Sequence, residues 1–333
     1  MFDLRLSPEQ LEIRDTVRDF VAREIRPQAL APARLEAFER PLLAGLLEAA
    51  SKLGLRTLAL PEDAGGAGAD ALTCCIVTEE LAAGDPDIAA VLAHTAALGP
   101  LLERGPFLAR FLEDDRFHLA LAAGVGTAQD GGEWRLDGVA TAVPNATVAR
   151  LFVVRNGSGA LLVPRESPGI SVREQAGDWY HGSCGEVTFS NCRVPAANST
   201  GAVGSIAPVL PAISLGIGRA AYEAALEYAK VRVQGGKPII EHQAIAAKLG
   251  GIAMRLEVAR SAVWRAAWAS DHPEAVADRS LPDLSLQAVA GAFAPEAMLR
   301  AAKDAAECFG AMGVMRDMPL HKFVRDARIC LHS

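Results

Sequence analysis

Hydrophobic and polar residues follow two different periods along this 333-residue chain. In the first third, apolar residues recur at helical spacing, which predicts amphipathic helices. Between about residues 119 and 197, short β-rich runs are divided by Gly, Asn, Ser and Pro, which predicts an antiparallel sheet or small barrel. From Pro208 onward the helical period returns in long stretches. Helices, then strands, then long helices predict an α+β protein with segregated layers.

Local signals place several element ends. Ser7 is expected to cap the first helix, with Pro8 at its first position and Gln10 at the capping-box position. Pro27 is expected to stop that helix. Apolar Phe323, Ala327 and Ile329 predict a final helix that enters a core. The predicted domains are an N-terminal helical domain over residues 1–118, a central β domain over 119–202 and a C-terminal helical domain over 203–333.

Composition narrows the functional classes. Half of the residues are apolar, so the chain can bury a large core. The net charge of -7 argues against a nucleic-acid partner, because phosphate binding needs a cationic surface. No run of residues has the character of a signal peptide or a membrane span, so no membrane insertion is expected and the cytoplasm is the expected location. No metal site is expected either, because the six cysteines show no ligand spacing and are interpreted as reduced, mostly buried thiols: Cys74, Cys75, Cys184, Cys192, Cys308 and Cys330.

Three stretches together resemble the acyl-CoA dehydrogenase family. They are "GEVTFSNCRVPAAN", "YAKVRVQGGKPIIEHQAIAAKLGG" and "ECFGAMGVMRDMPLHKFVRDARI", which follow the glycine-rich "LPEDAGGAGAD". The resemblance covers nearly the whole chain. It implies an N-terminal helical domain, a central antiparallel β domain and a C-terminal four-helix bundle. It also implies FAD as cofactor, an acyl-CoA substrate and an electron-transferring flavoprotein as acceptor. In this chemistry a carboxylate removes the α-proton of the thioester while the β-hydride passes to the flavin.

The first flavin motif of the family reads R-x-x-F-G, and its Arg contacts the FAD of a neighbouring subunit. The matching segment here is Arg232, Val233, Gln234, Gly235 and Gly236, in which a glycine replaces the Phe. The resemblance therefore assigns Arg232, Gln234 and Gly236 to cofactor binding, because an Arg can pair with a pyrophosphate. A solvated Arg in a turn is the alternative.

The second flavin motif, Q-x-x-G-G-x-G, aligns with residues 307–313. Glu307, Gly310 and Gly313 become candidate cofactor-binding residues, since glycines let backbone N–H groups approach phosphate. Glu307 departs from the family's Gln and, when ionised, would repel a pyrophosphate. The two glycines are equally consistent with a turn that only links helices.

Other family features are missing. The T-E-P-x-x-G-S-D loop is absent from "HLALAAGVGTAQDGGEWRLDG", and residues 140–144 replace the strand that packs against the flavin ring. The F-D-x-x-R-P motif that holds CoA aligns with residues 203–208 and keeps only Pro208. The catalytic Glu position of many members falls immediately after Ser333, so no catalytic residue is assigned.

These losses favour a subunit of an α2β2 FAD-dependent acyl-CoA dehydrogenase that acts on a bulky or steroid side-chain substrate. In this hypothesis the partner is a homologous acyl-CoA dehydrogenase subunit whose FAD site this chain completes in trans. Two alternatives stay open: an ordinary homotetrameric acyl-CoA dehydrogenase without its C-terminal tail, and a catalytically dead scaffold subunit.

Adjacent Glu79 and Glu80 face different directions, so they are not expected to form a catalytic dyad. One of them is expected to be solvated or to accept a hydrogen bond from a backbone amide. His242 is expected to cap a helix or to contact another subunit, and Arg325 and Asp326 to form ion pairs that position the last helix.

Overall fold

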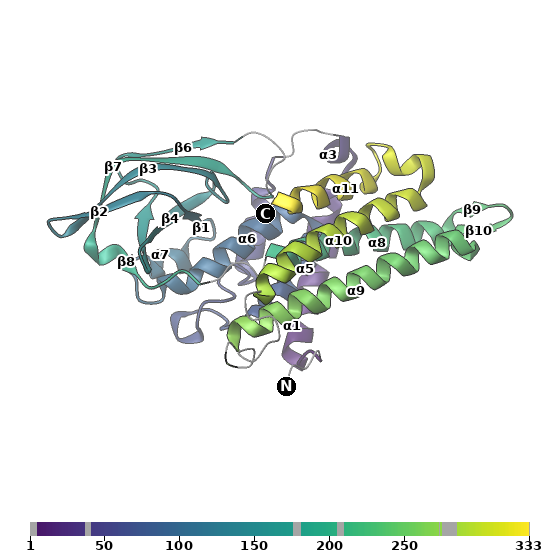
Figure 1. Ribbon diagram of the computed structural model, residues 1–333, viewed down its shortest axis with the longest axis horizontal. Coiled ribbons are helices and arrows are strands. Elements are labelled where there is room, and N and C mark those ends of the chain that lie inside the picture. Colours follow the sequence, from purple (N-terminus) through teal and green to yellow (C-terminus); the bar gives the residue numbers. More distant parts are fainter. Residues whose placement is uncertain are drawn as a thin grey trace. The chain divides into compact units, whose positions relative to one another are not determined.

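The computed structural model describes residues 5–36, 41–175, 181–204, 210–272, 274 and 285–332 (Figure 1). The chain forms two compact units. The first unit combines residues 1–41, 70–89 and 207–333, and the second combines residues 42–69 and 90–206. The fold is that expected from the sequence: N-terminal helices, a central β domain and C-terminal helices. The exact domain boundaries at residues 118 and 202 stay a prediction.

The first helix begins as its sequence predicts. In α1 (Pro8–Phe20) the Ser7 hydroxyl accepts from the Gln10 amide, and the Gln10 side chain accepts from the Ser7 amide, which completes a capping box. The expectation that Pro27 stops this helix is wrong. The chain passes through the π-helical turn η1 (Val21–Ile25) directly into α2 (Arg26–Ala29). Pro27 lies at the start of α2, where its missing N–H does no harm. A short helix, α3 (Pro32–Glu36), follows.

The first unit is built mainly from long helices that lie side by side (Figure 1). They are α5 (Ala71–Gly84), α8 (Leu210–Val231), α9 (Gln243–Asp271), α10 (Leu286–Cys308) and α11 (Pro319–Ile329). Short elements connect α8 to α9 and α10 to α11: β9 (Val233–Gln234), β10 (Lys237–Pro238), η5 (Ile239–Glu241) and η7 (Gly310–Val314). The short element η8 (Cys330–His332) follows α11.

Small residues let two of these helices pack closely. A Cβ atom on Gly216 of α8 would lie 2.4 Å from the backbone oxygen of Glu79 on α5. That distance is far below van der Waals contact, so the helix pair requires a glycine at this position. The final helix α11 buries Phe323, Ala327 and Ile329, as the apolar spacing predicts.

The second unit contains two four-stranded sheets with orders β1-β4-β5-β8 and β2-β3-β7-β6. The strands are β1 (His118–Ala122), β2 (Gly126–Asp130), β3 (Glu133–Val143), β4 (Ala149–Asn156), β5 (Gly159–Pro164), β6 (Ile170–Glu174), β7 (Gly185–Pro195) and β8 (Ser199–Thr200). Phe152 and Phe189 come from different sheets, and their rings meet edge to face with centroids 6.2 Å apart in the shared core.

The expectation of an antiparallel sheet needs one correction. Strands β1 and β4 are parallel, whereas the other strand pairs among the described residues are antiparallel. The chain leaves β1 to build β2 and β3 in the other sheet and then returns beside β1 in the same direction. A parallel pair requires such a crossover connection.

Helical elements complete the second unit: α4 (Ala44–Lys52), η2 (Glu62–Ala64), η3 (Gly99–Leu102), α7 (Leu108–Glu113) and η4 (Ala196–Asn198). The helix α6 (Pro86–Leu98) belongs to this unit from residue 90 onward. Leu98 and Phe111 pack with Leu151, Val153 and Leu162 of the first sheet in a second apolar cluster. In the described part of the chain, no helix is both long and apolar enough to cross a bilayer.

Candidate functional site

The predicted flavin residues 232–236 form a tight hairpin after α8. Gln234 pairs with Lys237, so Gly235 and Gly236 are the two central residues of the turn. Their φ values are +63° and +81°, the left-handed combination that a type I′ turn requires. A Phe at position 235, as in the family pattern, would be strained in this turn.

Arg232 has a fixed backbone and an available side chain. Its amide donates to the Tyr228 oxygen at 2.9 Å, and its own oxygen accepts from the Ile239 amide at 2.8 Å. The side chain is exposed, and no residue in the described ranges forms a hydrogen bond or ion pair with the guanidinium. This group is therefore free to bind an anion.

His242 supports the hairpin from the start of α9. It occupies the N-cap position but makes no side-chain capping bond, so the capping expectation is wrong. Its Nε2 instead lies 2.9 Å from the Gln234 oxygen, and a carbonyl oxygen can only accept, so Nε2 donates. The contact holds one side of the hairpin and leaves the Gln234 side chain exposed.

The second predicted motif lies where α10 ends. Gly310 is exposed with φ +60°, and a Cβ there would meet nothing within 4 Å. Gly313 differs, because a Cβ on it would lie 2.1 Å from the Ala306 oxygen. The fold alone thus requires Gly313, which supports the turn interpretation at that position. Gly310 leaves open space in which a ligand can approach the backbone.

Glu307 is paired rather than left as a free negative charge. Its carboxylate accepts from the ammonium of Lys248 on α9. This hydrogen bond and the attraction between the charges lower the pKa of Glu307 and raise the pKa of Lys248. The sequence gives no signal for this pair, because the two residues are 59 positions apart. Lys248 offsets the repulsion that Glu307 would exert on a bound phosphate.

Contact between aromatic rings brings the two motifs to one end of the helices. The Tyr228 ring, in the last turn of α8, stacks on Phe309 of the second motif with centroids 4.0 Å apart. Arg232 and Lys248 supply positive charge there, and Gly236 and Gly310 are exposed glycines. This donor set fits a pyrophosphate, the anionic part of FAD.

The β strand that would meet the flavin ring has a different character. Within residues 140–144, the side chains of Ala140 and Val143 point into the core, with 1% and 2% exposure. Ala142 has φ +53° at a bulge between them. No aromatic side chain lies in this stretch, so the strand does not fit the face of an isoalloxazine ring.

One further family feature, the loop between β1 and β2, falls wholly within the described residues. Only residues 123–125 join β1 to β2, which leaves no room for a T-E-P-type loop. Residues 205–208 of the predicted CoA motif and Ser333 lie outside the described ranges.

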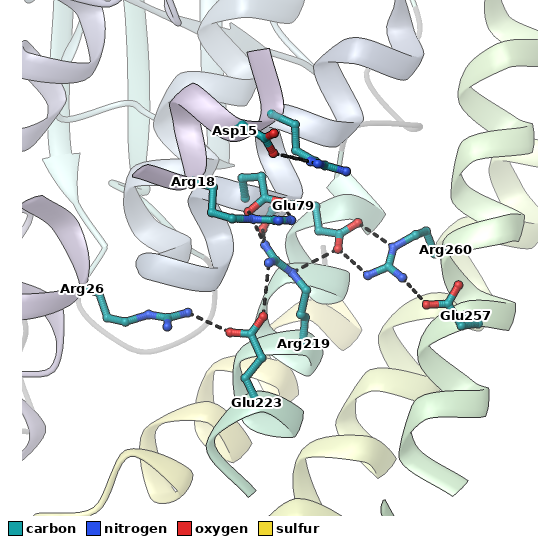
Figure 2. Close-up of polar contacts among 10 residues, drawn as sticks. Asp15, Arg18, Arg26, Glu79, Arg219, Glu223, Glu257 and Arg260 are labelled. Atoms are coloured by element: carbon teal, nitrogen blue, oxygen red, sulfur yellow. Dashed lines mark hydrogen bonds and ion pairs between the residues drawn. The ribbon is translucent and has the colours of Figure 1, made fainter. Parts of the chain in front are cut away.

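A buried ion network lies among α1, α5, α8 and α9 of the first unit (Figure 2). Glu79 accepts from Arg260 at 2.7 Å and pairs with Arg219 at 3.2 Å. Glu80 pairs with Arg18 and with Arg219, at 2.7 Å each. The expectation that one carboxylate is solvated or bonded to a backbone amide is therefore wrong: both are buried and accept from arginines.

The network lines a cavity of about 360 Å³. Four arginines and three glutamates line it, so its charges are nearly balanced. The carboxylates of Glu79 and Glu80 are shared among three of these arginines. Burial disfavours the charged form of Arg260, but the bonds to Glu79 outweigh this and raise its pKa. The network joins helices through its ion pairs, and within the described ranges the buried Nε1 atom of Trp264 at the cavity wall has no hydrogen-bond acceptor.

The last helix holds a separate buried pair. The Lys322 ammonium lies 2.5 Å from the Asp326 carboxylate, and both side chains are almost fully buried. This pair bears out the expectation of an ion pair for Asp326, formed within α11 itself. The six cysteines form no disulfide, and burial raises the pKa of the Cys74 thiol to about 12.

Comparisons with known proteins cover almost the entire chain. Residues 7–106 match the model of the acyl-CoA dehydrogenase N-terminal domain, and residues 206–331 match that of the acyl-CoA dehydrogenase C-terminal domain. A benzylmalonyl-CoA dehydrogenase from Aromatoleum aromaticum is 31% identical over 99% of this chain and 95% of its own length.

Solved structures share the fold. Butyryl-CoA dehydrogenase from Megasphaera elsdenii is 25% identical, with a TM-score of 0.83 over 99% of this chain and 95% of its own. A chain of the ChsE4-ChsE5 complex from Mycobacterium tuberculosis is 24% identical, with a TM-score of 0.81 over 99% of this chain and 94% of its own.

These matches confirm the fold prediction. They also confirm the predicted oxidoreductase chemistry, with FAD as the cofactor of acyl-CoA dehydrogenases. With a relative above 30% identity aligned over nearly its full length, and both family domains in the expected order, the chain belongs to the acyl-CoA dehydrogenase family.

Proposed function

We propose that this chain is a subunit of an α2β2 acyl-CoA dehydrogenase and completes the FAD site of a homologous partner subunit in trans. One observation carries the proposal. The two flavin motifs meet at one end of α8 and α10, and the Arg232 guanidinium has no partner among the described residues, while residues 140–144 offer no platform for a flavin ring.

In the proposed complex, Arg232 and the exposed glycine turns bind the pyrophosphate of FAD, and Lys248 keeps Glu307 neutralised beside it. FAD, when bound, accepts the hydride during α,β-desaturation of an acyl-CoA thioester. The partner subunit supplies the base and the ring pocket. Among the structures with this fold, the ChsE4-ChsE5 complex contains two named chains, which supports a hetero-oligomeric arrangement.

The finer assignments follow from the same proposal. We take the substrate to be a bulky or steroid side-chain acyl-CoA, the acceptor to be an electron-transferring flavoprotein and the location to be the cytoplasm. Gln234 and Gly313 remain proposed cofactor-site residues, Gly313 through the shape of its turn rather than through a direct contact.

The test is the FAD content of the chain purified alone and after co-expression with a homologous acyl-CoA dehydrogenase subunit. We expect flavin absorbance only in the co-purified complex, at one FAD per two chains. One FAD per chain in a homo-oligomer that turns over acyl-CoA would refute the proposal. If the complex kept the same flavin content after Arg232→Ala, the scaffold alternative would be favoured.

Two sets of variants sharpen this test. Arg232→Ala should lower the flavin content of the complex about tenfold, since charge-assisted hydrogen bonds are lost. Arg265→Ala is the matched control, because Arg265 is also exposed and no residue in the described ranges pairs with it. Equal flavin content in the two variants would contradict the role of Arg232.

The second set concerns the Lys248–Glu307 pair. Lys248→Met leaves the Glu307 carboxylate uncompensated and should weaken flavin retention. Glu307→Gln in the same chain should restore it, because the amide carries no charge. A double variant as poor as Lys248→Met alone would show that Lys248 acts in some other way.

A further inference from the structure

A basic pocket of about 330 Å³ lies within the second unit. Its floor comes from the start of α4 and from the edge of the first sheet, and it is lined by Leu42, Ala44, Leu47, Glu48, Arg116, His118, Thr147, Val148, Ala149, Arg150 and Arg165. Three of these residues are arginines, and one is a carboxylate. Neither the flavin motifs nor the ion network contributes a residue to it.

The topology of the sheet explains why the arginines converge. Strands β1 and β4 are parallel neighbours, and β5 pairs antiparallel with β4. The beginnings of β1 and β4 therefore lie at the same sheet edge as the end of β5. Arg116 precedes β1, Arg150 is the second residue of β4, and Arg165 follows β5. Neighbouring strands are only about 4.8 Å apart, so the three guanidinium groups are held near one another.

Internal partners leave much of this positive charge uncompensated. Arg116 pairs with Glu48 at 2.7 Å. Arg165 donates through its Nη1 atom to the Ala146 oxygen at 2.6 Å and to the Ala149 oxygen at 3.2 Å. Throughout the described ranges, nothing forms a hydrogen bond or ion pair with the Arg150 guanidinium.

Two other carboxylates lie nearby. Asp114 accepts from the Arg116 amide at 2.9 Å. Glu166 interacts electrostatically with Arg150, but its hydrogen-bonded partner is another arginine. It forms an ion pair with Arg110 at 3.0 Å. Burial lowers the pKa of Arg165, and the positive charge of Arg150 adds to this effect. Burial also lowers the pKa of His118 to about 4, helped by Arg56 and Arg150 and opposed by Asp114. His118 is therefore neutral at pH 7 and lines the pocket as an uncharged hydrogen-bonding group.

We propose that this basic pocket binds the phosphate group of a small soluble molecule. Two backbone oxygens hold the Nη1 atom of Arg165, and its other N–H groups can donate to a ligand. The exposed side chain of Arg150 can fold over a bound anion. Guanidinium groups match the tetrahedral oxygens of a phosphate better than a point charge does. The volume exceeds the needs of a lone ion, so a phosphorylated small molecule and free orthophosphate are the two sources to distinguish.

Calorimetric titration of the full chain with orthophosphate, and separately with adenosine monophosphate, tests the proposal. Binding should weaken as sodium chloride is raised, because the interaction is between charges. Tighter binding of the nucleotide would identify a phosphate ester as the ligand class, and equal binding would identify the phosphate ion alone. Absence of heat with both ligands at millimolar concentration would overturn the proposal.

Variants tie any binding to this pocket. Arg150→Gln should weaken phosphate binding about tenfold and leave the unfolding midpoint unchanged, since no residue in the described ranges forms a hydrogen bond or ion pair with this side chain. Arg155→Gln is the control, because Arg155 is exposed near the other end of the same strand. Identical affinities for Arg150→Gln and the unmodified chain would rule out this site, whatever the behaviour of Arg165 variants that disturb the fold.

Discussion

The ring of Tyr228 lies parallel to the ring of Phe309, with an interplanar angle of 11° and centroids 4.0 Å apart. One ring precedes the hairpin that follows α8, and the other begins the turn that follows α10. The motifs that begin at Arg232 and Glu307, far apart in the sequence, are therefore joined by one aromatic contact. This stack fixes the spacing between the residues proposed to hold the FAD pyrophosphate.

Replacing Phe309 should affect both stability and flavin retention. Phe309→Ala removes a buried ring, so we expect a loss of about 3 kcal/mol in the free energy of unfolding. The co-purified complex should also retain less FAD, because the two turns lose their common support. Urea unfolding and flavin absorbance measure the two effects. Phe293→Ala, within α10, is the control, since that ring is 42% exposed. Similar losses in both variants would contradict the role of the stack.

Arg219 is the central cation of the buried ion network, where it contacts both Glu79 and Glu80. Arg219→Leu should destabilise the protein by about 3–5 kcal/mol, because two buried carboxylates lose a partner. Equilibrium urea unfolding measures the change. Glu227→Gln breaks an exposed pair with Lys230 and should cost less than about 1 kcal/mol. If both variants unfolded at the same urea concentration, the network would contribute nothing beyond a surface ion pair.

A close backbone contact requires a glycine at position 313. Comparison with a glycine inside a helix separates this steric effect from the effect of helix propensity. Gly313→Ala forces a Cβ against the Ala306 oxygen, so the turn must move, and we expect a loss of about 2 kcal/mol or more. Gly291→Ala lies in open space within α10 and should stabilise the chain by about 0.5–1 kcal/mol. Thermal unfolding distinguishes the two. Opposite signs are the expected result, and a neutral Gly313→Ala would show that the turn relaxes freely.

His118 should make stability depend on pH in a defined window. Its pKa falls from the ordinary value of 6.5 to about 4 in the folded chain, chiefly because the ring is buried. Between these two pH values the unfolded chain binds more protons than the folded chain. The contribution of neutral His118 to the free energy of unfolding is therefore fully present above pH 6.5 and is lost as the pH falls toward 4. The full effect is about 3 kcal/mol.

Urea unfolding at pH 7 and pH 5 measures this dependence. His118→Gln should flatten the pH profile relative to the unmodified chain, because the amide does not titrate. Arg56, Asp114 and Arg150 act on the same ring and stay in place in the variant. An unchanged profile would mean that His118 keeps a nearly ordinary pKa in the folded protein.

Much of the secondary structure could be predicted because its causes are local. The capping box at Ser7 and Gln10 uses residues three positions apart, and the helical period of α11 follows from its own side chains. Motif spacing was equally informative for the family, since Arg232 and Gly310 keep their places relative to the surrounding helices. Pro27 shows the limit of local reading, because a π-helical turn placed the proline where a helix tolerates it.

The tertiary structure decided which distant groups meet. Helix packing pairs Lys248 with Glu307 and Arg219 with both Glu79 and Glu80. The sequence shows that these residues are charged but does not show which of them pair. The parallel pairing of β1 with β4 was also hidden, because alternation of apolar residues is the same for either strand direction. The sequence by itself determined most of the helices and strands, the order of the domains and the family to which the chain belongs. Only the packing decided which charges are neutralised and which arginines remain free to bind an anion, since that depends on long-range contacts.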